Sequence, residues 1–206
     1  MIILYAHPSQ IVLKVNILLE ETGMDYVSVN DHTLEEGTPE YLAFIRASPM
    51  GQVPAIYDSD KDVALFETSD IMIYLAEKAG QFLPGLDRPQ ARAETLKWFM
   101  FEAATLSPTM LDIYHYTLKA PDPNPYSEER ARMAALRAIS VLEDVMTQGK
   151  GRDFLAVEYS IADMMLYPWL SILEDFADIP LSDYPALEAW TTRMASRTAV
   201  QVFAVA

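Results

Sequence analysis

Two short stretches of this sequence contain residue types that can hold a small peptide. The first is Ser48-Pro49-Met50-Gly51-Gln52-Val53-Pro54, which leads into the apolar residues 55–57. Because proline has no backbone N–H to donate to a sheet, Pro54 belongs at the start or the edge of a strand. A cis Val53–Pro54 bond would turn the Val53 backbone outward, where its N–H and C=O can pair with an extended peptide. A trans bond would leave Pro54 as an ordinary strand-initiating residue, and both alternatives stay open.

The second stretch is Phe66-Glu67-Thr68-Ser69-Asp70, directly before a run with helical spacing. A helix N-terminus has free N–H groups and partial positive charge, and it therefore suits a carboxylate. Glu67 can meet an amino group, while the N–H and hydroxyl of Thr68 meet a carboxylate. A ligand with both groups on one carbon would satisfy the two residues together. The alternative is that this stretch is only a helix cap.

The elements that position these stretches can be read from the first 80 residues. Strand-like runs cover 2–6, 26–29, 53–57 and 63–66, and helical segments cover 12–22, 39–45 and 68–79. Gly23 and Gly80 are helix stop signals. The initial strand–helix–strand unit predicts parallel strands, and the polar turn 58–62 predicts a hairpin. The order β-α-β-α-β-β-α is that of a thioredoxin-like domain.

The rest of the chain has the periodicity of helices. Helical segments are predicted near 90–118, 128–148, 160–176 and 185–196. Prolines at 84 and 89 mark a linker, and the Pro-rich run 121–125 breaks the helical region. We therefore expect an α+β protein in which residues 1–80 form the thioredoxin-like domain and residues 88–206 form an all-α bundle.

Composition excludes several function classes. The 206 residues include 30 acidic and 15 basic side chains, a formal net charge of −15 that argues against nucleic-acid binding. There is no cysteine, which excludes disulfides, Cys-ligated metals and a protein thiol nucleophile. No HxxxH or HExxH spacing occurs, so no metal site is predicted. No signal-peptide pattern and no apolar stretch of about 18 residues is present, and we expect a cytoplasmic protein without a membrane span.

Three segments together give the chain a resemblance to the cytosolic glutathione transferases. They are Ser-Pro-Met-Gly-Gln-Val-Pro at 48–54, Glu-Thr-Ser-Asp-Ile-Met-Ile-Tyr-Leu-Ala-Glu at 67–77 and Phe-Leu-Ala-Val-Glu-Tyr-Ser-Ile-Ala-Asp at 154–163. The resemblance covers nearly the whole chain and is closest to the bacterial and fungal nu-like group. It implies a thioredoxin-like glutathione-binding domain, an all-helical domain, glutathione as a substrate and a homodimer.

The resemblance also implies residue roles in glutathione binding. Val53, next to Pro54, would pair through its backbone with the cysteinyl part of glutathione. Glu67 and Thr68 would hold the γ-glutamyl end. Gln52 is at a position where the family often places a side chain near the glycine end of the tripeptide.

A further match to the family has a structural role. Ser160-Ile161-Ala162-Asp163 corresponds to its helix-capping box, which satisfies free N–H groups at a helix start. The family often has glycine where Val157 stands in this chain.

The thiol of glutathione needs a group that stabilises its ionised form, and a hydroxyl donor can do this. Ser9 lies between the first strand and the first helix, where the family places its catalytic Tyr, Ser or Cys, and is our candidate catalytic residue. Tyr5 and His7 are alternatives, and Ser9 can also act only as a cap. Nu-like proteins have Pro-Thr-Pro-Asn here, whereas this chain has Pro8-Ser9-Gln10-Ile11. Ile11 therefore lacks the amide donor of that asparagine.

A second substrate is expected against the helix near 90–118. Met110 and Tyr114, with Trp98 and Phe101, can line an apolar pocket there, although such residues are more often plain core. Three ring-bearing residues in a row, Tyr114-His115-Tyr116, cannot all face one core.

Three functions remain compatible with the sequence. The favoured one is a glutathione transferase in which a hydroxyl-stabilised thiolate attacks an electrophilic hydrophobic co-substrate, because Ile11 departs from the nu-like pattern. The alternatives are a glutathione-dependent disulfide-bond reductase or peroxidase, and a non-catalytic binding protein on the same fold.

Overall fold

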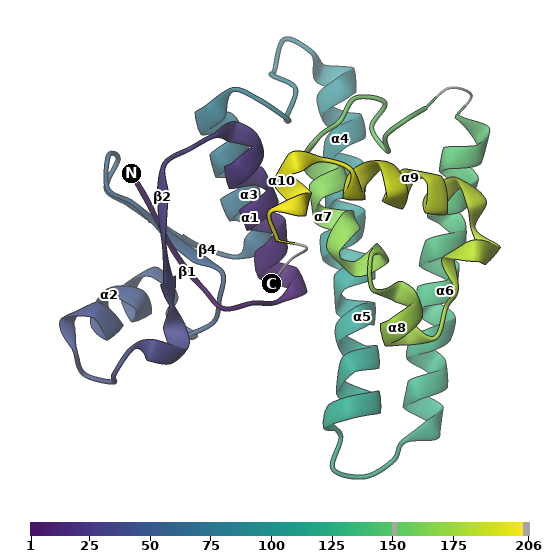
Figure 1. The fold of residues 1–206 in the computed structure, drawn as a ribbon, viewed down its shortest axis with the longest axis horizontal. Helices are drawn as coiled ribbons and strands as arrows, with labels where there is room; N and C mark the ends of the chain where they lie inside the picture. The colour runs from purple at the N-terminus through teal and green to yellow at the C-terminus, as the bar shows by residue number, and fades with distance from the viewer. Residues whose placement is uncertain (150–151, 204–206) are drawn as a thin grey trace. The chain divides into compact units, whose positions relative to one another are not determined.

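The computed structural model describes residues 1–149 and 152–203. These residues form two compact units, 1–83 with 202–203 and 84–201 (Figure 1). The domain boundaries expected from the sequence, 1–80 and 88–206, stay a prediction.

The first unit contains a four-stranded mixed sheet and three α-helices. Along the chain they are β1 (Ile2–Ala6), α1 (Gln10–Thr22), β2 (Tyr26–Asn30), α2 (Pro39–Ala47), β3 (Ala55–Asp58), β4 (Val63–Phe66) and α3 (Thr68–Ala79). The sheet order is β2-β1-β3-β4, with β1 and β2 parallel and the other two pairs antiparallel. The predicted thioredoxin-like order is confirmed.

Alternating side chains divide the sheet into two packed faces. Leu4 pairs with Ile56, and both are completely buried. Their neighbour Tyr5 points to the opposite face, where its ring meets Phe44 of α2 with centroids 5.2 Å apart. Helices α1 and α3 lie side by side away from α2 (Figure 1). The sheet is thus a central layer with α2 on one side and α1 with α3 on the other.

The boundaries of α1 and α3 follow from single residues. Ser9 caps α1, since its Oγ accepts a hydrogen bond from the backbone N–H of Val12 at 3.2 Å. Gly23 ends α1 and Gly80 ends α3, with φ of 64° and 66°. Glycine suits these left-handed positions because it has no Cβ.

The second unit contains helices joined by loops, and no strand occurs among its described residues. It contains α4 (Pro89–Phe101), α5 (Ser107–Tyr114), α6 (Pro125–Gln148), α7 (Ile161–Leu170), α8 (Leu173–Ala177), α9 (Pro185–Ala195) and α10 (Thr198–Gln201). All ten residues of α7 are buried, and α7 contacts α4 and α9. Helices α5 and α6 run beside each other, joined by a loop at one end (Figure 1). No helix among the described residues is both long and apolar enough to cross a bilayer.

Two predicted helices differ in detail from the observed ones. The segment predicted at 90–118 contains two π-helical turns, Glu102–Leu106 and His115–Lys119. The segment predicted at 160–176 is divided into α7 and α8. There the hydroxyl of Ser171 donates to the carbonyl of Pro168 at 2.9 Å, while the N–H of Ile172 turns to Trp169. The side chain competes with the helical backbone and ends α7.

Candidate functional site

Strand register brings three separate segments to one edge of the sheet. Tyr5 near the end of β1 pairs with Ala55 at the start of β3, and Ala55 pairs with Phe66 at the end of β4. The segments that continue from these residues therefore emerge together: 7–9, 52–54 and 67–68. We call this the strand-end edge. It contains the candidate catalytic and glutathione-binding residues of the first unit.

The loop before β3 presents the backbone of Val53. The Val53–Pro54 bond is cis, and Pro54 is buried while Val53 is half-buried. Buried Ser48 donates its hydroxyl to the carbonyl of Gln52 at 2.7 Å and accepts from the Gln52 N–H at 3.1 Å. Within the described residues the Val53 backbone forms no hydrogen bond. Its donor and acceptor are therefore available to an extended ligand.

The start of α3 combines a carboxylate with uncapped helix N–H groups. In the described part of the chain no side chain caps α3, in contrast to α1 and to α2, which is capped by Thr38. Exposed Glu67 has φ 71° and ψ 114°, a conformation that non-glycine residues rarely adopt. Among the described residues Glu67 makes no ion pair, and Thr68 is half-buried beside it. This pattern complements a ligand carrying an amino group and a carboxylate together.

A buried carboxylate fixes α3 against the hairpin. Asp58 at the end of β3 accepts hydrogen bonds from the Tyr74 hydroxyl at 2.6 Å, from the ammonium of Lys78 and from the backbone N–H of Asp60. Burial alone would raise the pKa of Asp58, but these bonds and the Lys78 charge lower it to about 2. Asp58 therefore stays ionised and holds the middle and the last turn of α3 against the end of β3.

Ser9 is exposed at the strand-end edge. Within the described residues its hydroxyl makes only the cap bond, in which the oxygen accepts, so its proton is free to donate. Ser9 borders a hollow of about 470 Å³ on the side of α1, shared with His7, Asn16 and Asn30. We call it the α1 hollow.

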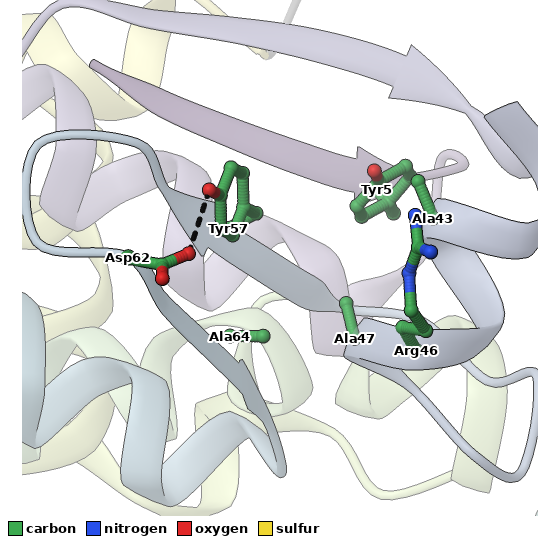
Figure 2. A pocket seen from close by; sticks show the side chains of 7 residues that line it. All are labelled: Tyr5, Ala43, Arg46, Ala47, Tyr57, Asp62 and Ala64. Atoms are coloured by element: carbon green, nitrogen blue, oxygen red, sulfur yellow. Dashed lines mark hydrogen bonds between the residues drawn. The ribbon is translucent and has the colours of Figure 1, made fainter. Parts of the chain in front are cut away.

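Tyr5, the rival hydroxyl, opens into a different hollow of about 430 Å³ on the α2 face (Figure 2). Arg46 extends from α2 toward Tyr5, and the Tyr57 hydroxyl donates to Asp62 at 2.9 Å. Burial raises the pKa of Tyr5, although the Arg46 charge opposes this. The described residues that line one hollow do not line the other, so Tyr5 and Ser9 face different spaces.

The sequence interpretation missed a cluster of His7, Asp31 and His32. His7 Nδ1 lies 2.9 Å from Asp31 Oδ1, and the two imidazoles stack with centroids 4.4 Å apart. The HxxxH and HExxH spacings describe ligands on one helix, whereas these residues follow two different strands. The predicted parallel pairing of those strands was the signal that could have found them, because parallel strands end at the same edge.

The residues predicted for the second substrate lie in the helical unit. Met110 is completely buried, and Tyr114 is exposed and stacks on Phe176 with centroids 6.0 Å apart. Lys119 lies 5.4 Å from the Tyr114 ring centroid. His115 is also exposed, as expected from the three consecutive rings. The substrate roles of Met110 and Tyr114 stay predictions.

Comparison with known proteins agrees with the fold in both units. The family described as Glutathione S-transferase, N-terminal domain, matches residues 8–78, and the family described as Glutathione S-transferase, C-terminal domain, matches residues 106–198. This chain belongs to the glutathione S-transferase family. The resemblance seen in the sequence is therefore confirmed.

Among curated proteins, this glutathione S-transferase family member is 34% identical to the disulfide-bond oxidoreductase YfcG of Escherichia coli (strain K12). That match covers 97% of this chain and 92% of YfcG. It is also 31% identical to the disulfide-bond oxidoreductase YghU of the same organism, over 91% of this chain and 68% of YghU.

A solved structure matches this transferase-family chain along almost its whole length. It is a glutathione transferase family member from Pseudomonas fluorescens pf-5, crystallised with two glutathione molecules bound. The TM-score is 0.83 at 32% identity, covering 97% of this chain and 90% of that one.

Proposed function

We propose that this protein is an enzyme that reduces disulfides with glutathione. The observation that carries the proposal is the 34% identity to the disulfide-bond oxidoreductase YfcG over 97% of the chain. The sequence alone favoured the transferase reaction because of Ile11. The curated relatives YfcG and YghU favour the alternative, since both are disulfide-bond oxidoreductases.

The strand-end edge supports glutathione as the bound reductant. The free N–H and C=O of Val53 would pair with the backbone of the cysteinyl residue, as in strand addition. The γ-glutamyl end carries an amino group and a carboxylate, which would meet Glu67 and the uncapped N–H groups at Thr68. Gln52 is exposed beside Val53 and would contact the glycine end.

The role proposed for Ser9 is to stabilise the glutathione thiolate. A charge-assisted hydrogen bond contributes about 1.5–3 kcal/mol, and each tenfold gain in thiolate population needs about 1.4 kcal/mol. One serine hydroxyl therefore suffices to lower the thiol pKa substantially. The N-terminus of α1 adds favourable partial charge.

The absence of cysteine fixes the electron balance of the reaction. The chain has no thiol of its own, so no mixed disulfide can form on the protein. A glutathione thiolate would attack one sulfur of the substrate disulfide, and the other sulfur would leave and take a proton. A second glutathione thiolate would then attack the glutathione sulfur of the new mixed disulfide. The products are glutathione disulfide and two thiols, with both electrons coming from glutathione.

Two glutathione molecules must therefore be accommodated during one cycle. The relative from Pseudomonas fluorescens pf-5 holds two glutathione molecules. This agrees with the requirement derived from the lack of cysteine.

The transferase reaction is the second candidate. Ile11 occupies the position of the nu-like asparagine and removes an amide donor near the thiol. An apolar pocket around Met110 and Tyr114 would then bind an electrophile for attack at carbon.

We also infer a cytoplasmic homodimer from the family membership, and sedimentation equilibrium would give twice the chain mass.

An activity panel separates the candidates. The protein is assayed with glutathione and, in parallel, a glutathione mixed disulfide, an aryl halide and a hydroperoxide. We expect the mixed disulfide to be turned over fastest relative to the protein-free rate. Preferential turnover of the aryl halide would instead support the transferase reaction. Glutathione binding without any turnover would support a binding protein.

A further inference from the structure

We propose that His7, Asp31 and His32 form a binding site for one divalent transition-metal ion, with Zn²⁺ the best match. One nitrogen of each imidazole and one carboxylate oxygen all lie within 4.8 Å of one another. His7 Nδ1 is 2.9 Å from Asp31 Oδ1, and His32 Nε2 is 3.8 Å from Asp31 Oδ2. The proposed ligands do not include Ser9, Val53 or Glu67, although His7 lies in the strand-end edge.

The backbone explains why the three side chains converge. Ala6 at the end of β1 pairs in parallel with Asn30 at the end of β2, so His7 and Asp31 continue from neighbouring positions. The Asn30 side chain accepts a hydrogen bond from the His32 N–H at 3.0 Å, and the Thr33 hydroxyl donates to the Asn30 carbonyl at 2.7 Å. Asn30 therefore stabilises the turn that carries Asp31 and His32 through both its side chain and its backbone carbonyl.

Joint ligation requires the His32 ring to rotate. The imidazoles of His7 and His32 stack with planes only 20° apart, so their in-plane nitrogen lone pairs meet at one ion only after one ring turns. Asp31 is only 12% exposed, whereas His32 is 68% exposed and has room to adjust. The carboxylate is the fixed member of the set, and the His32 ring can move toward it.

The donor set has the chemistry that Zn²⁺ requires. Imidazole nitrogen and carboxylate oxygen are ordinary zinc ligands at about 2.0–2.2 Å, so tetrahedral ligand atoms lie roughly 3.3 Å apart. The observed spacings bracket this value. Three protein ligands leave one position for water or another small ligand. A Ca²⁺ or Mg²⁺ site would need mainly oxygen ligands.

The competing explanation is a plain hydrogen bond between His7 and Asp31, without any metal. That arrangement would need only two of the three residues. The hydrogen bond between His7 and Asp31 does not involve the largely exposed His32, whereas ligation uses all three side chains.

The test uses the full chain without a polyhistidine tag, stripped of metal and free of glutathione, which itself binds metals. Titration calorimetry with Zn²⁺ should show one ion bound per chain, and Zn²⁺ should raise the Tm because ligation ties together two segments of the folded chain. The variants His32→Gln and Asp31→Asn should each bind Zn²⁺ at least about tenfold more weakly.

The matched control is His115→Gln, the third histidine of the chain, which is exposed in the helical unit. It should bind Zn²⁺ like the parent. Circular dichroism checks that each variant is folded, which is expected because His32 is exposed. With Co²⁺ the parent should give the visible absorption of a tetrahedral site, and His32→Gln should lose it.

Two results would overturn the proposal. One is the absence of saturable Zn²⁺ binding by the parent chain below millimolar concentration. The other is equal binding by the parent, His32→Gln and Asp31→Asn, which would place any bound ion elsewhere.

Discussion

At the residue scale, Ser9 can perform two tasks with different parts of one hydroxyl. Its oxygen caps α1 by accepting from the Val12 N–H, and its proton remains available to a thiolate. Ser9→Ala removes both functions. We expect a loss of about 1 kcal/mol in the free energy of unfolding. We also expect a fall of roughly tenfold to a hundredfold in turnover, because one charge-assisted bond is lost.

Ser9→Asp separates the two tasks. Aspartate is a good N-cap, so urea denaturation should show near-parental stability. The ionised side chain has no proton to donate and repels a thiolate, so turnover should fall at least as far as in Ser9→Ala. Full turnover in Ser9→Asp would remove Ser9 from the mechanism.

Glu67 is expected to affect stability and ligand binding in opposite directions. Its backbone has φ 71° and ψ 114°, and glycine reaches this conformation at lower cost than glutamate because it has no Cβ. Glu67→Gly should therefore raise the free energy of unfolding by about 1 kcal/mol. The same change removes the carboxylate proposed to meet the glutathione amino group, so glutathione should bind more weakly.

Glu67→Gln is the control for that pair of effects. It keeps the strained backbone and removes only the charge, so it should weaken glutathione binding without a gain in stability. Parental affinity in both variants, measured by titration calorimetry, would contradict the role proposed for Glu67.

At the element scale, the start of α7 depends on one buried carboxylate. Asp163 accepts hydrogen bonds from the backbone N–H groups of Leu155 and Ser160, from the Ser160 hydroxyl and from the Trp190 indole. This is the capping box predicted from the sequence, and it also joins α7 to α9. Burial raises the pKa of Asp163 to about 6, although these hydrogen bonds oppose the rise.

This raised pKa predicts a pH-dependent contribution to stability. The ordinary value is 3.8, so between about pH 4 and 6 the folded chain retains a proton that the unfolded chain releases. The contribution of Asp163 to stability therefore falls as pH rises through 6. The stability difference between the parent and Asp163→Asn should shrink by about 1.4 kcal/mol from pH 5 to 7.5. A constant difference in denaturation experiments would show that Asp163 has an ordinary pKa.

In the turn before α7, the backbone of Val157 is strained, and a substitution by glycine should relieve the strain. Val157 is exposed and has φ 76°, a left-handed conformation that a β-branched residue rarely adopts. Val157→Gly should raise the free energy of unfolding by about 1 kcal/mol. The control Val141→Gly, at an exposed position inside α6, should lower it by a similar amount. Destabilisation by both substitutions would contradict strain at Val157.

At the scale of the whole molecule, hydrophobic periodicity was enough to predict the order of elements in the first unit. It was not enough for the details of the helical unit. The π-helical turn at 102–106 preserves the apolar spacing of a helix, and the end of α7 depends on a hydroxyl contact made by Ser171. Neither feature changes the hydrophobic pattern.

The candidate site likewise combines residues that a local sequence pattern indicates with residues that it does not. Glu67 and Val53 could be predicted because each belongs to a local motif whose chemistry can be read along the chain. The cluster of His7, Asp31 and His32 could not be predicted from spacing, because it depends on register between two strands. Local motifs are visible along the chain, whereas this cluster could be found only through the predicted parallel pairing of the two strands.

The central claim is that this fold binds glutathione at the strand-end edge and transfers its electrons without a protein thiol. Titration calorimetry of the parent protein with glutathione disulfide, the expected product, tests it most directly. The account predicts saturable binding below millimolar concentration that glutathione competes for and that Glu67→Gln weakens. Absence of binding at millimolar glutathione disulfide and glutathione would contradict it.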